Sequence, residues 1–132
     1  MHAKFRRDAT IAAFAVLLTT TVAAAQPAKL PPSEIQTTFF NGQPFTASTL
    51  SNVKYNMTFM ADGKMKRQPV GGGNKGEGTW KLSKDGFCTT WAGSTLSNCF
   101  TLMSAGTNKW SVMKGSSIQA VWTCLLYTSR CV

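Results

Sequence analysis

The sequence predicts an all-β protein, in which a single antiparallel meander closes into a small up-and-down barrel of the calycin-like form. A β-sandwich is the second choice. Two observations predict this class: apolar and polar residues alternate with a period of two in several short segments, and glycine, asparagine and aspartate separate those segments. The sequence has no heptad repeat and no helical apolar stripe longer than one or two turns. Because each strand has one apolar face, the sheet must close on itself or fold over.

The first 25 residues have the parts of a signal peptide. Basic residues stand at positions 4, 6 and 7, and an apolar Ala/Thr-rich run, Thr10–Ala25, follows them. The run ends with alanine at positions 23 and 25, the small-x-small arrangement that signal peptidase accepts. We therefore expect cleavage between Ala25 and Gln26 and a periplasmic or secreted protein that keeps no membrane span. A retained N-terminal anchor is the alternative.

The remainder divides into three parts. Residues 26–36 hold three of the five prolines and predict an extended arm. Residues 37–123 form the barrel domain. The last nine residues, "CLLYTSRCV" (124–132), back-translate to a string that resembles a transposon end used in sequencing-library adapters, joined to its own reverse complement. We expect this tail to be non-native, with a genuine C-terminal strand as the alternative.

The strands are predicted in chain order. In "VKYNMTFM" (53–60) the apolar residues alternate with polar ones, Asp62-Gly63 is a favoured hairpin corner, and "KMKRQPV" (64–70) returns as a charged edge strand that ends at a proline. Residues 71–78, "GGGNKGEG", are expected to form a flexible loop at the barrel mouth. Five further strands are expected at 79–83, 87–91, 98–103, 109–113 and 117–122.

One face of these strands is aromatic and methionine-rich. It forms either the plain core or the lining of a ligand cavity. Its residues are Tyr55, Met57, Phe59, Trp80, Trp110 and Trp122.

Cys88 and Cys99 are expected to form a structural disulfide. If the strands around 87–91 and 96–102 pair with these cysteines opposite each other, their Cα atoms lie about 4.5–5.5 Å apart, within disulfide range. The same register sets two apolar pairs opposite each other, Phe87 with Phe100 and Trp91 with Leu96. An exported protein should hold such a pair oxidised.

Other cysteine chemistry is disfavoured. The single histidine, His2, lies in the signal segment, so a zinc site or a cysteine nucleophile would lack its usual partner. The spacing of the two cysteines does not match the C-x-x-C of redox sites. Asp62 and Asp85 occupy predicted hairpin corners, where their side chains have a local role. We expect no catalytic residue, no metal and no cofactor, and hence no enzyme.

The chain is basic, with a formal net charge of +9. Between residues 26 and 123, nine lysines and one arginine exceed four acidic residues, which leaves about +6. A basic patch would favour an anionic envelope component over nucleic acid, for which no stacking motif is present; a solvated lysine-rich edge is the simpler interpretation. The candidate patch consists of Lys54, Lys64, Lys66, Arg67 and Lys75.

Two resemblances to known families follow from these motifs. "GTW" at 78–80, Asp85-Gly86, Cys88-x-x-Trp91 and Cys99, with "FMADG" at 59–63, resemble a family of small secreted proteobacterial proteins known as domain of unknown function 995. That resemblance implies an exported β-rich domain and supplies no catalytic residues. Gly78, Trp80, Leu82 and the disulfide are similar to the periplasmic inhibitors of secreted metalloproteases, whose free N-terminal arm enters the protease.

These resemblances and the composition leave two functions open. The first is a binding protein for a small apolar or anionic envelope ligand, which the aromatic face would hold. The second is a protein-binding inhibitor or envelope factor that acts through residues 26–36 and the exposed loops. The partner itself is not predicted by the sequence.

Overall fold

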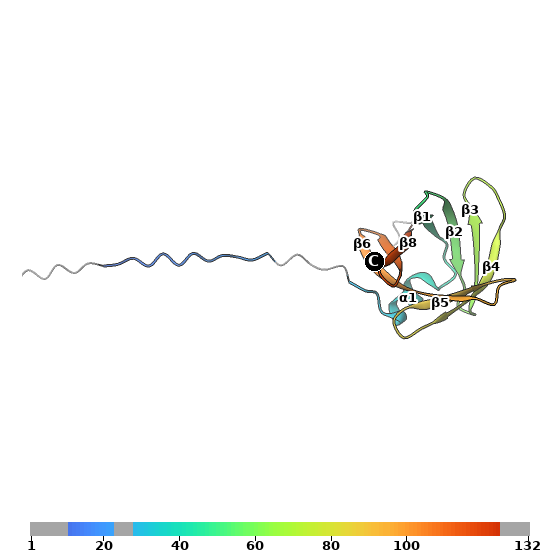
Figure 1. Cartoon of the computed structure of the whole chain (residues 1–132), viewed down its shortest axis with the longest axis horizontal. Coiled ribbons are helices and arrows are strands. Elements are labelled where there is room, and N and C mark those ends of the chain that lie inside the picture. Colours follow the sequence, from blue (N-terminus) through green and yellow to red (C-terminus); the bar gives the residue numbers. More distant parts are fainter. Residues whose placement is uncertain (1–10, 23–27, 125–132) are drawn as a thin grey trace, which may run out of the picture.

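The structure, a computed structural model, describes residues 11–22 and 28–124. Within them, eight antiparallel strands pair in sequence order and close into a barrel, which confirms the predicted up-and-down architecture (Figure 1). One short helix, α1 (Pro32–Phe39), precedes the barrel. The strands are β1 (Phe45–Thr49), β2 (Lys54–Phe59), β3 (Lys64–Pro69), β4 (Gly76–Leu82), β5 (Phe87–Trp91), β6 (Ser97–Gly106), β7 (Lys109–Lys114) and β8 (Ser117–Thr123).

The predicted corner at Asp62-Gly63 is confirmed and shows why these residues turn the chain. Gly63 has a φ of +90°, a conformation that glycine adopts without steric cost. The carboxylate of Asp62 accepts a hydrogen bond of 3.0 Å from the backbone N–H of Lys64. Both interactions direct β3 back along β2, and the two strands pair from Phe59–Met65 to Tyr55–Pro69.

Strand β1 closes the barrel and was not predicted. It pairs with β2 along one edge, where Phe45 faces Met57, and with β8 along the other, where Ala47 faces Trp122. Its sequence, "FTAST", contains small and polar residues, so its alternation is weak. Phe45 and Ala47 are nevertheless buried, because pairing on both edges directs them into the barrel.

Strand β4 starts earlier than predicted, at Gly76, so the loop predicted over 71–78 is three residues too long. Glycine is required there because the β5 backbone and long side chains of β3 crowd the β4 backbone. A Cβ at position 78 would lie 2.5 Å from the backbone carbonyl oxygen of Thr90. Gly78 lies opposite Met65, and a Cβ at position 78 would lie 2.7 Å from the methionine Cε. Gly76 lies opposite Arg67, whose Nε would be 2.9 Å from a Cβ at position 76.

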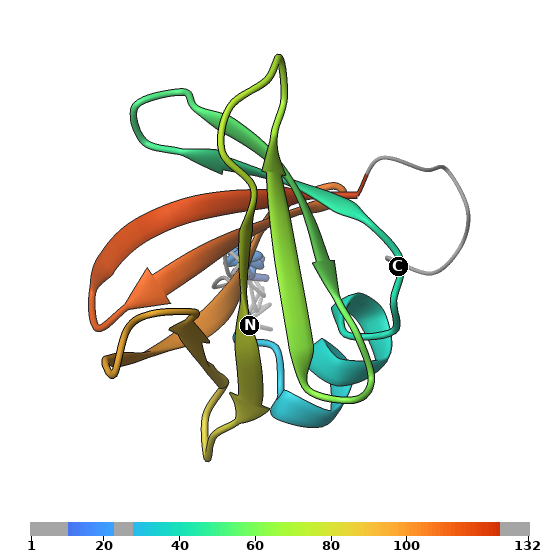
Figure 2. The ribbon, with the colours of Figure 1, turned by 90° about the vertical axis from the view of Figure 1, so that its right-hand side faces the viewer.

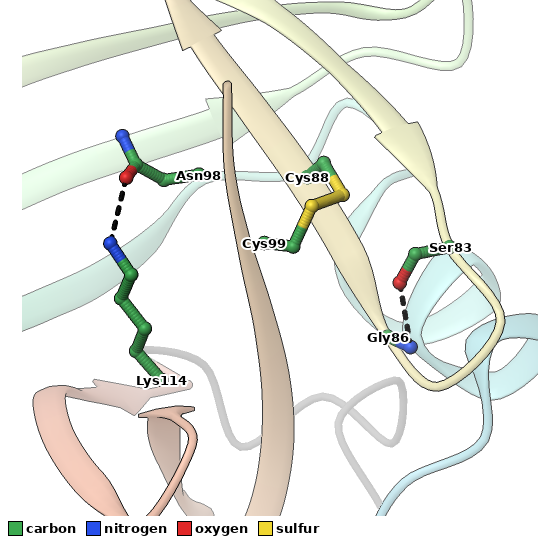
Figure 3. The surroundings of a disulfide bond; sticks show 6 residues. All are labelled: Ser83, Gly86, Cys88, Asn98, Cys99 and Lys114. Atoms are coloured by element: carbon green, nitrogen blue, oxygen red, sulfur yellow. Dashed lines mark hydrogen bonds between the residues drawn. A yellow bond between two sulfur atoms is a disulfide. The ribbon is translucent and has the colours of Figure 1, made fainter. Parts of the chain in front are cut away.

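The predicted disulfide hairpin is confirmed at its centre. Cys88 pairs with Cys99, their Cα atoms are 3.9 Å apart, and their sulfurs are bonded (Figure 3). Phe87 faces Phe100, as the register requires. The predicted pairing of Trp91 with Leu96 is wrong: the ladder ends one pair earlier, at Thr90–Ser97, and Leu96 is 73% exposed in the connecting loop.

The extended arm predicted over residues 26–36 is wrong for its second half. Pro31 and Pro32 stand at the start of α1, where proline lacks only an N–H that the helix would leave unpaired. Ile35 and Phe39, four residues apart, form one buried stripe. The helix forms because the barrel interior covers that stripe, whereas an eight-residue helix is marginal by itself.

The residues before α1 are extended but not free. The N–H of Leu30 donates to the carbonyl of Leu102, and the N–H of Ser104 donates to the carbonyl of Ala28. Lys29 forms a bridge with Met103 of β6. This edge of β6 is available because β5 pairs only with its first half, up to Phe100. The described part of the arm therefore covers a sheet edge.

The core lies between α1 and one end of the barrel. Phe40 stacks on Phe59 with a centroid distance of 4.4 Å, and Phe39 lies edge-on to Phe45 at 5.1 Å. Both rings also contact Trp122. Figure 2 shows α1 at one end of the barrel, with the β1–β2 and β3–β4 loops on the side away from it. The helix thus fills one end of the barrel with aromatic rings.

The ends of the chain are described only in part. Residues 11–22 form no helix or strand and are exposed. Among the described residues, no helix combines the length and the apolar character that a membrane crossing needs. The predicted cleavage position and residues 125–132 of the predicted tail lie outside the described residues. Cys124, the first residue of that tail, packs against the core and is disulfide-bonded.

Candidate functional site

The half of the barrel that α1 does not fill contains a cavity of about 180 Å³. Its floor is formed by Phe59, Phe87 and Trp122. On their other side these rings contact Phe40, which with α1 fills the opposite end of the barrel and is called the helical plug below. The remaining residues that line it come from β1, β2, β3, β5, β6, β7 and β8, and they are Ala47, Thr49, Tyr55, Met57, Arg67, Thr89, Trp91, Phe100, Val112, Gln119 and Ala120.

The cavity is closed at the end that α1 fills and open at the other, and the strand directions show which connections lie at each end. Strand β1 runs from Phe45, which contacts the plug, to Thr49 at the mouth, and β2 returns from Tyr55 at the mouth to Phe59 at the floor. The β1–β2, β3–β4, β5–β6 and β7–β8 connections therefore lie around the mouth. The glycine-rich β3–β4 loop is at this end.

Four of the six predicted face residues line the cavity: Tyr55, Met57, Phe59 and Trp122. The other two serve the plug. Trp80 packs on Phe40 at 4.5 Å and donates a hydrogen bond of 2.8 Å to the carbonyl of Met60. Trp110 lies edge-on to Phe39 at 5.1 Å. The predicted face is thus core at one end and cavity lining at the other.

Arg67 is the main lining residue that the sequence analysis missed. Its guanidinium carbon lies 4.2 Å from the centre of the Trp91 ring and 5.0 Å from that of Tyr55. A cation between two aromatic faces is attracted to both, and the rings fix the plane of the guanidinium. The period-two pattern of β3, in which Arg67 shares a face with buried Met65, was the signal that places it inside.

Gln119 reaches the cavity for a different reason. The β7–β8 pairing shifts between Val112 and Met113, so Met113 faces Ile118 while Val112 faces Ala120. The extra residue of this bulge changes which side chains face inward, as bulges generally do. Ile118, which strict alternation would place on the same face as Trp122, is 43% exposed as a result.

The predicted basic patch is divided between two faces of β3. Lys64 and Lys66 are exposed on the outside of the barrel, as are Lys54 and Lys75 at its mouth. The Arg67 guanidinium lies over the Trp91 ring inside the barrel, although the residue also lines an outer pocket with Lys66 and Lys75. Lys66 also lies directly opposite Glu77 on β4, which offsets part of its charge. The outer face of β3 is therefore less basic than the sequence indicates.

Two polar hydrogen bonds lie near the disulfide. Asn98, next to Cys99, accepts a hydrogen bond of 2.9 Å from the ammonium of Lys114, and the Ser83 hydroxyl accepts one from the N–H of Gly86 (Figure 3). Across the described residues, no group of three His, Cys, Asp or Glu side chains is arranged to hold a metal.

No protein-family model matches the chain, and no curated protein or solved structure is significantly similar to it. The two resemblances that the motifs indicate therefore stay predictions.

Proposed function

We propose that this protein is an exported, non-enzymatic binding protein whose barrel holds a small apolar or anionic ligand. The supporting observation is the apolar cavity between the aromatic floor and Arg67. Ligand sites in proteins are concave and mostly apolar, with a few polar groups that set orientation. Here the lining residues with polar groups are Thr49, Tyr55, Arg67, Thr89 and Gln119.

The division of the barrel interior supports this proposal. Eight-stranded barrels are just wide enough to be filled by side chains or to hold one small ligand. In this chain the helix carries Phe39 and Phe40 into one end only. At the other end the larger lining residues alternate with the small side chains of Ala47, Thr89 and Ala120, which leave the cavity unfilled. Unfilled apolar space forfeits packing contacts, and a ligand would restore them.

Export is supported by two features. The basic start and apolar run of residues 1–25 have the pattern of a signal peptide. The bond between Cys88 and Cys99 is of the kind that persists in oxidising compartments. A periplasmic or secreted location also makes lipids and other envelope molecules available as ligands.

Tryptophan fluorescence tests the proposal because the four tryptophans divide between the two ends of the barrel. Octanoate and octan-1-ol, two small chains of equal length, are titrated into the oxidised protein. We expect at least one to change the emission with saturation, and Trp91→Phe to remove a large part of that change. Trp80→Phe, at the plug, is the matched control and should retain it. No saturable change with any apolar or amphipathic compound would refute the proposal.

The protein-binding alternative has less support. It requires a free N-terminal arm, but Ala28–Leu30 pairs with β6 and α1 is packed into the barrel. The exposed contact elements that remain in the described barrel are the loops around the mouth and the turns at the plugged end, such as those at Asp62 and Asp85. Deletion of residues 26–36 would remove Ile35, which is fully buried, so this deletion would unfold the barrel and could not test partner capture separately.

A further inference from the structure

Arg67 has hydrogen-bonding capacity that the described part of the chain does not use. An arginine carries five N–H donors in a planar fork. Trp91 and Tyr55 contact the faces of the guanidinium, but they offer no acceptor in its plane. Within the described residues, no carboxylate pairs with Arg67 and no oxygen accepts a hydrogen bond from its side chain. The donors at the cavity mouth are therefore available to a ligand.

We infer that the cavity binds a carboxylate-headed amphiphile, with Arg67 holding the head group and the chain extending toward Trp122. This inference rests on the proposed function, since it needs an occupied cavity. Arginine and carboxylate form paired, charge-assisted hydrogen bonds, which are stronger than neutral ones. A carboxylate at the edge of an apolar cavity needs such a partner, because burying an unpaired charge is costly.

The size of the cavity limits the length of the chain. About 180 Å³ is below the roughly 300–1,000 Å³ of pockets for drug-sized ligands. A medium-length acyl chain fits this space better than a long one. The floor rings of Phe59, Phe87 and Trp122 limit how far the chain reaches, since the helical plug supports them from behind.

The test compares octanoate with octan-1-ol by calorimetry on the oxidised protein. We expect octanoate to bind the unmodified protein about tenfold more tightly or better, the difference that a charge-assisted pair supplies. Arg67→Met should remove that preference, so that octanoate and octan-1-ol bind this variant with affinities within about twofold of each other. Lys66→Met removes the same charge from the neighbouring outward position and should change neither affinity.

The outcomes separate this inference from the proposed function. Equal affinities of the unmodified protein for octanoate and octan-1-ol would overturn the role of Arg67 and leave the binding function intact. Binding of neither compound, nor of any other apolar compound, would remove both. If Arg67→Met does not fold, Arg67→Lys keeps the charge without the planar fork and should lose part of the preference; an unchanged preference would contradict recognition by the fork.

A second inference starts from the exposed apolar side chains of the described barrel domain, residues 28–124. All of its large exposed hydrophobic residues lie at the mouth, in the loops or strand starts opposite the helical plug. They are Leu50, Val53, Val70, Leu96 and Ile118. Single exposed apolar residues are ordinary, but their gathering at one end of a molecule indicates an interaction surface.

Basic residues outnumber acidic ones at the mouth. Lys54, Lys75 and Lys114 lie among the apolar residues of the mouth, at the beginning of β2, before β4 and at the end of β7. The exposed carboxylate at the mouth is Glu77, beside Lys75, whereas the plugged end carries Lys64, Lys84 and Lys109 together with Asp62 and Asp85. From this arrangement we propose that the mouth docks on an anionic lipid bilayer, with the apolar tips in the interface and the lysines at the lipid phosphates.

Vesicle sedimentation tests the docking surface. Binding to vesicles of phosphatidylcholine and phosphatidylglycerol should exceed binding to phosphatidylcholine alone. Lys54→Glu with Lys75→Glu should weaken it by about tenfold or more, since each basic residue near the surface contributes about 1 kcal/mol. The matched control, Lys64→Glu with Lys109→Glu, makes the same charge change toward the plugged end and should have a clearly smaller effect.

A second pair of substitutions tests the apolar contribution. Leu50→Ser with Leu96→Ser should also weaken vesicle binding, because both side chains are 73% exposed and would enter the interface. Equal losses for the two lysine pairs would show attraction by net charge alone and overturn the orientation. Undiminished binding of the Leu50→Ser, Leu96→Ser protein, or no binding to the anionic vesicles, would overturn the docking surface.

Discussion

The ring of Phe40 lies almost parallel to that of Phe59, with 4.4 Å between centroids and 13° between planes. This contact joins the segment before the barrel to the inside of β2. Phe40 also reaches Trp80, Phe87 and Trp122, so a residue at the end of α1 contacts β2, β4, β5 and β8. The helix is therefore part of the barrel interior, and the cavity exists only in the space that it leaves.

Phe40→Ala tests the plug. Phe40 is 1% exposed, and truncation of a buried phenylalanine typically costs about 3–5 kcal/mol in the free energy of unfolding. We expect a loss of this size in urea unfolding. Leu96→Ala, at a position 73% exposed, serves as the control and should cost less than about 0.5 kcal/mol. Comparable losses for the two variants would mean that the helix does not fill the barrel.

The disulfide is expected to supply a substantial part of the stability. Cys88 and Cys99 are 11 residues apart, and closing a loop of that length stabilises by about 3 kcal/mol in the chain-entropy estimate. The double variant Cys88→Ala, Cys99→Ala should unfold at correspondingly lower urea concentration under non-reducing conditions. Because Cys124 is also bonded, adding a reductant to the unmodified protein would not isolate this effect. A loss of unfolding free energy below about 1 kcal/mol would contradict this stabilising role of the disulfide.

Gly86 is required by a close approach of two backbone segments. A Cβ on Gly86 would overlap the carbonyl oxygen of Phe100, a backbone atom that cannot move without shifting β6. We expect Gly86→Ala to cost more than about 2 kcal/mol in unfolding free energy. Gly93→Ala meets no atom within 4 Å but has a φ of +82°, so it should cost only about 1 kcal/mol. Equal costs would argue against the β5–β6 geometry.

The strands could be predicted from sequence where the alternation was strong and the turns carried glycine with aspartate. In β2, Met57 and Phe59 alternate with polar residues, and the cysteines of the next hairpin fixed its register. Strand β1 and helix α1 could not be found in the same way. The pattern of β1 is too short and polar, and Ile35 and Phe39 make only one helical pair, so both elements depend on contacts far along the chain.

The cavity was predictable only in part. Alternation identified Met57 and Trp122 as inward-facing, but it cannot distinguish a residue that packs against the plug from one that faces empty space. That distinction depends on how far α1 reaches into the barrel, which no local sequence pattern predicts. The charge of Arg67 predicts a surface position, although its place two residues after Met65 on β3 indicates the inner face.

Filling the cavity should separate ligand binding from folding. Ala120 lines the cavity on β8, and Ala120→Leu places three more carbon atoms in space that the protein leaves empty. The new contacts offset the crowding, so the free energy of unfolding should change by less than about 1.5 kcal/mol. The affinity for octanoate should fall by about tenfold or more, because the side chain occupies the volume of the acyl chain. Ala105→Leu, on the exposed part of β6, is the matched control and should leave octanoate binding unchanged. Octanoate binding that survives in the Ala120→Leu protein would place the ligand outside the barrel and leave the mouth, not the interior, as the site of recognition.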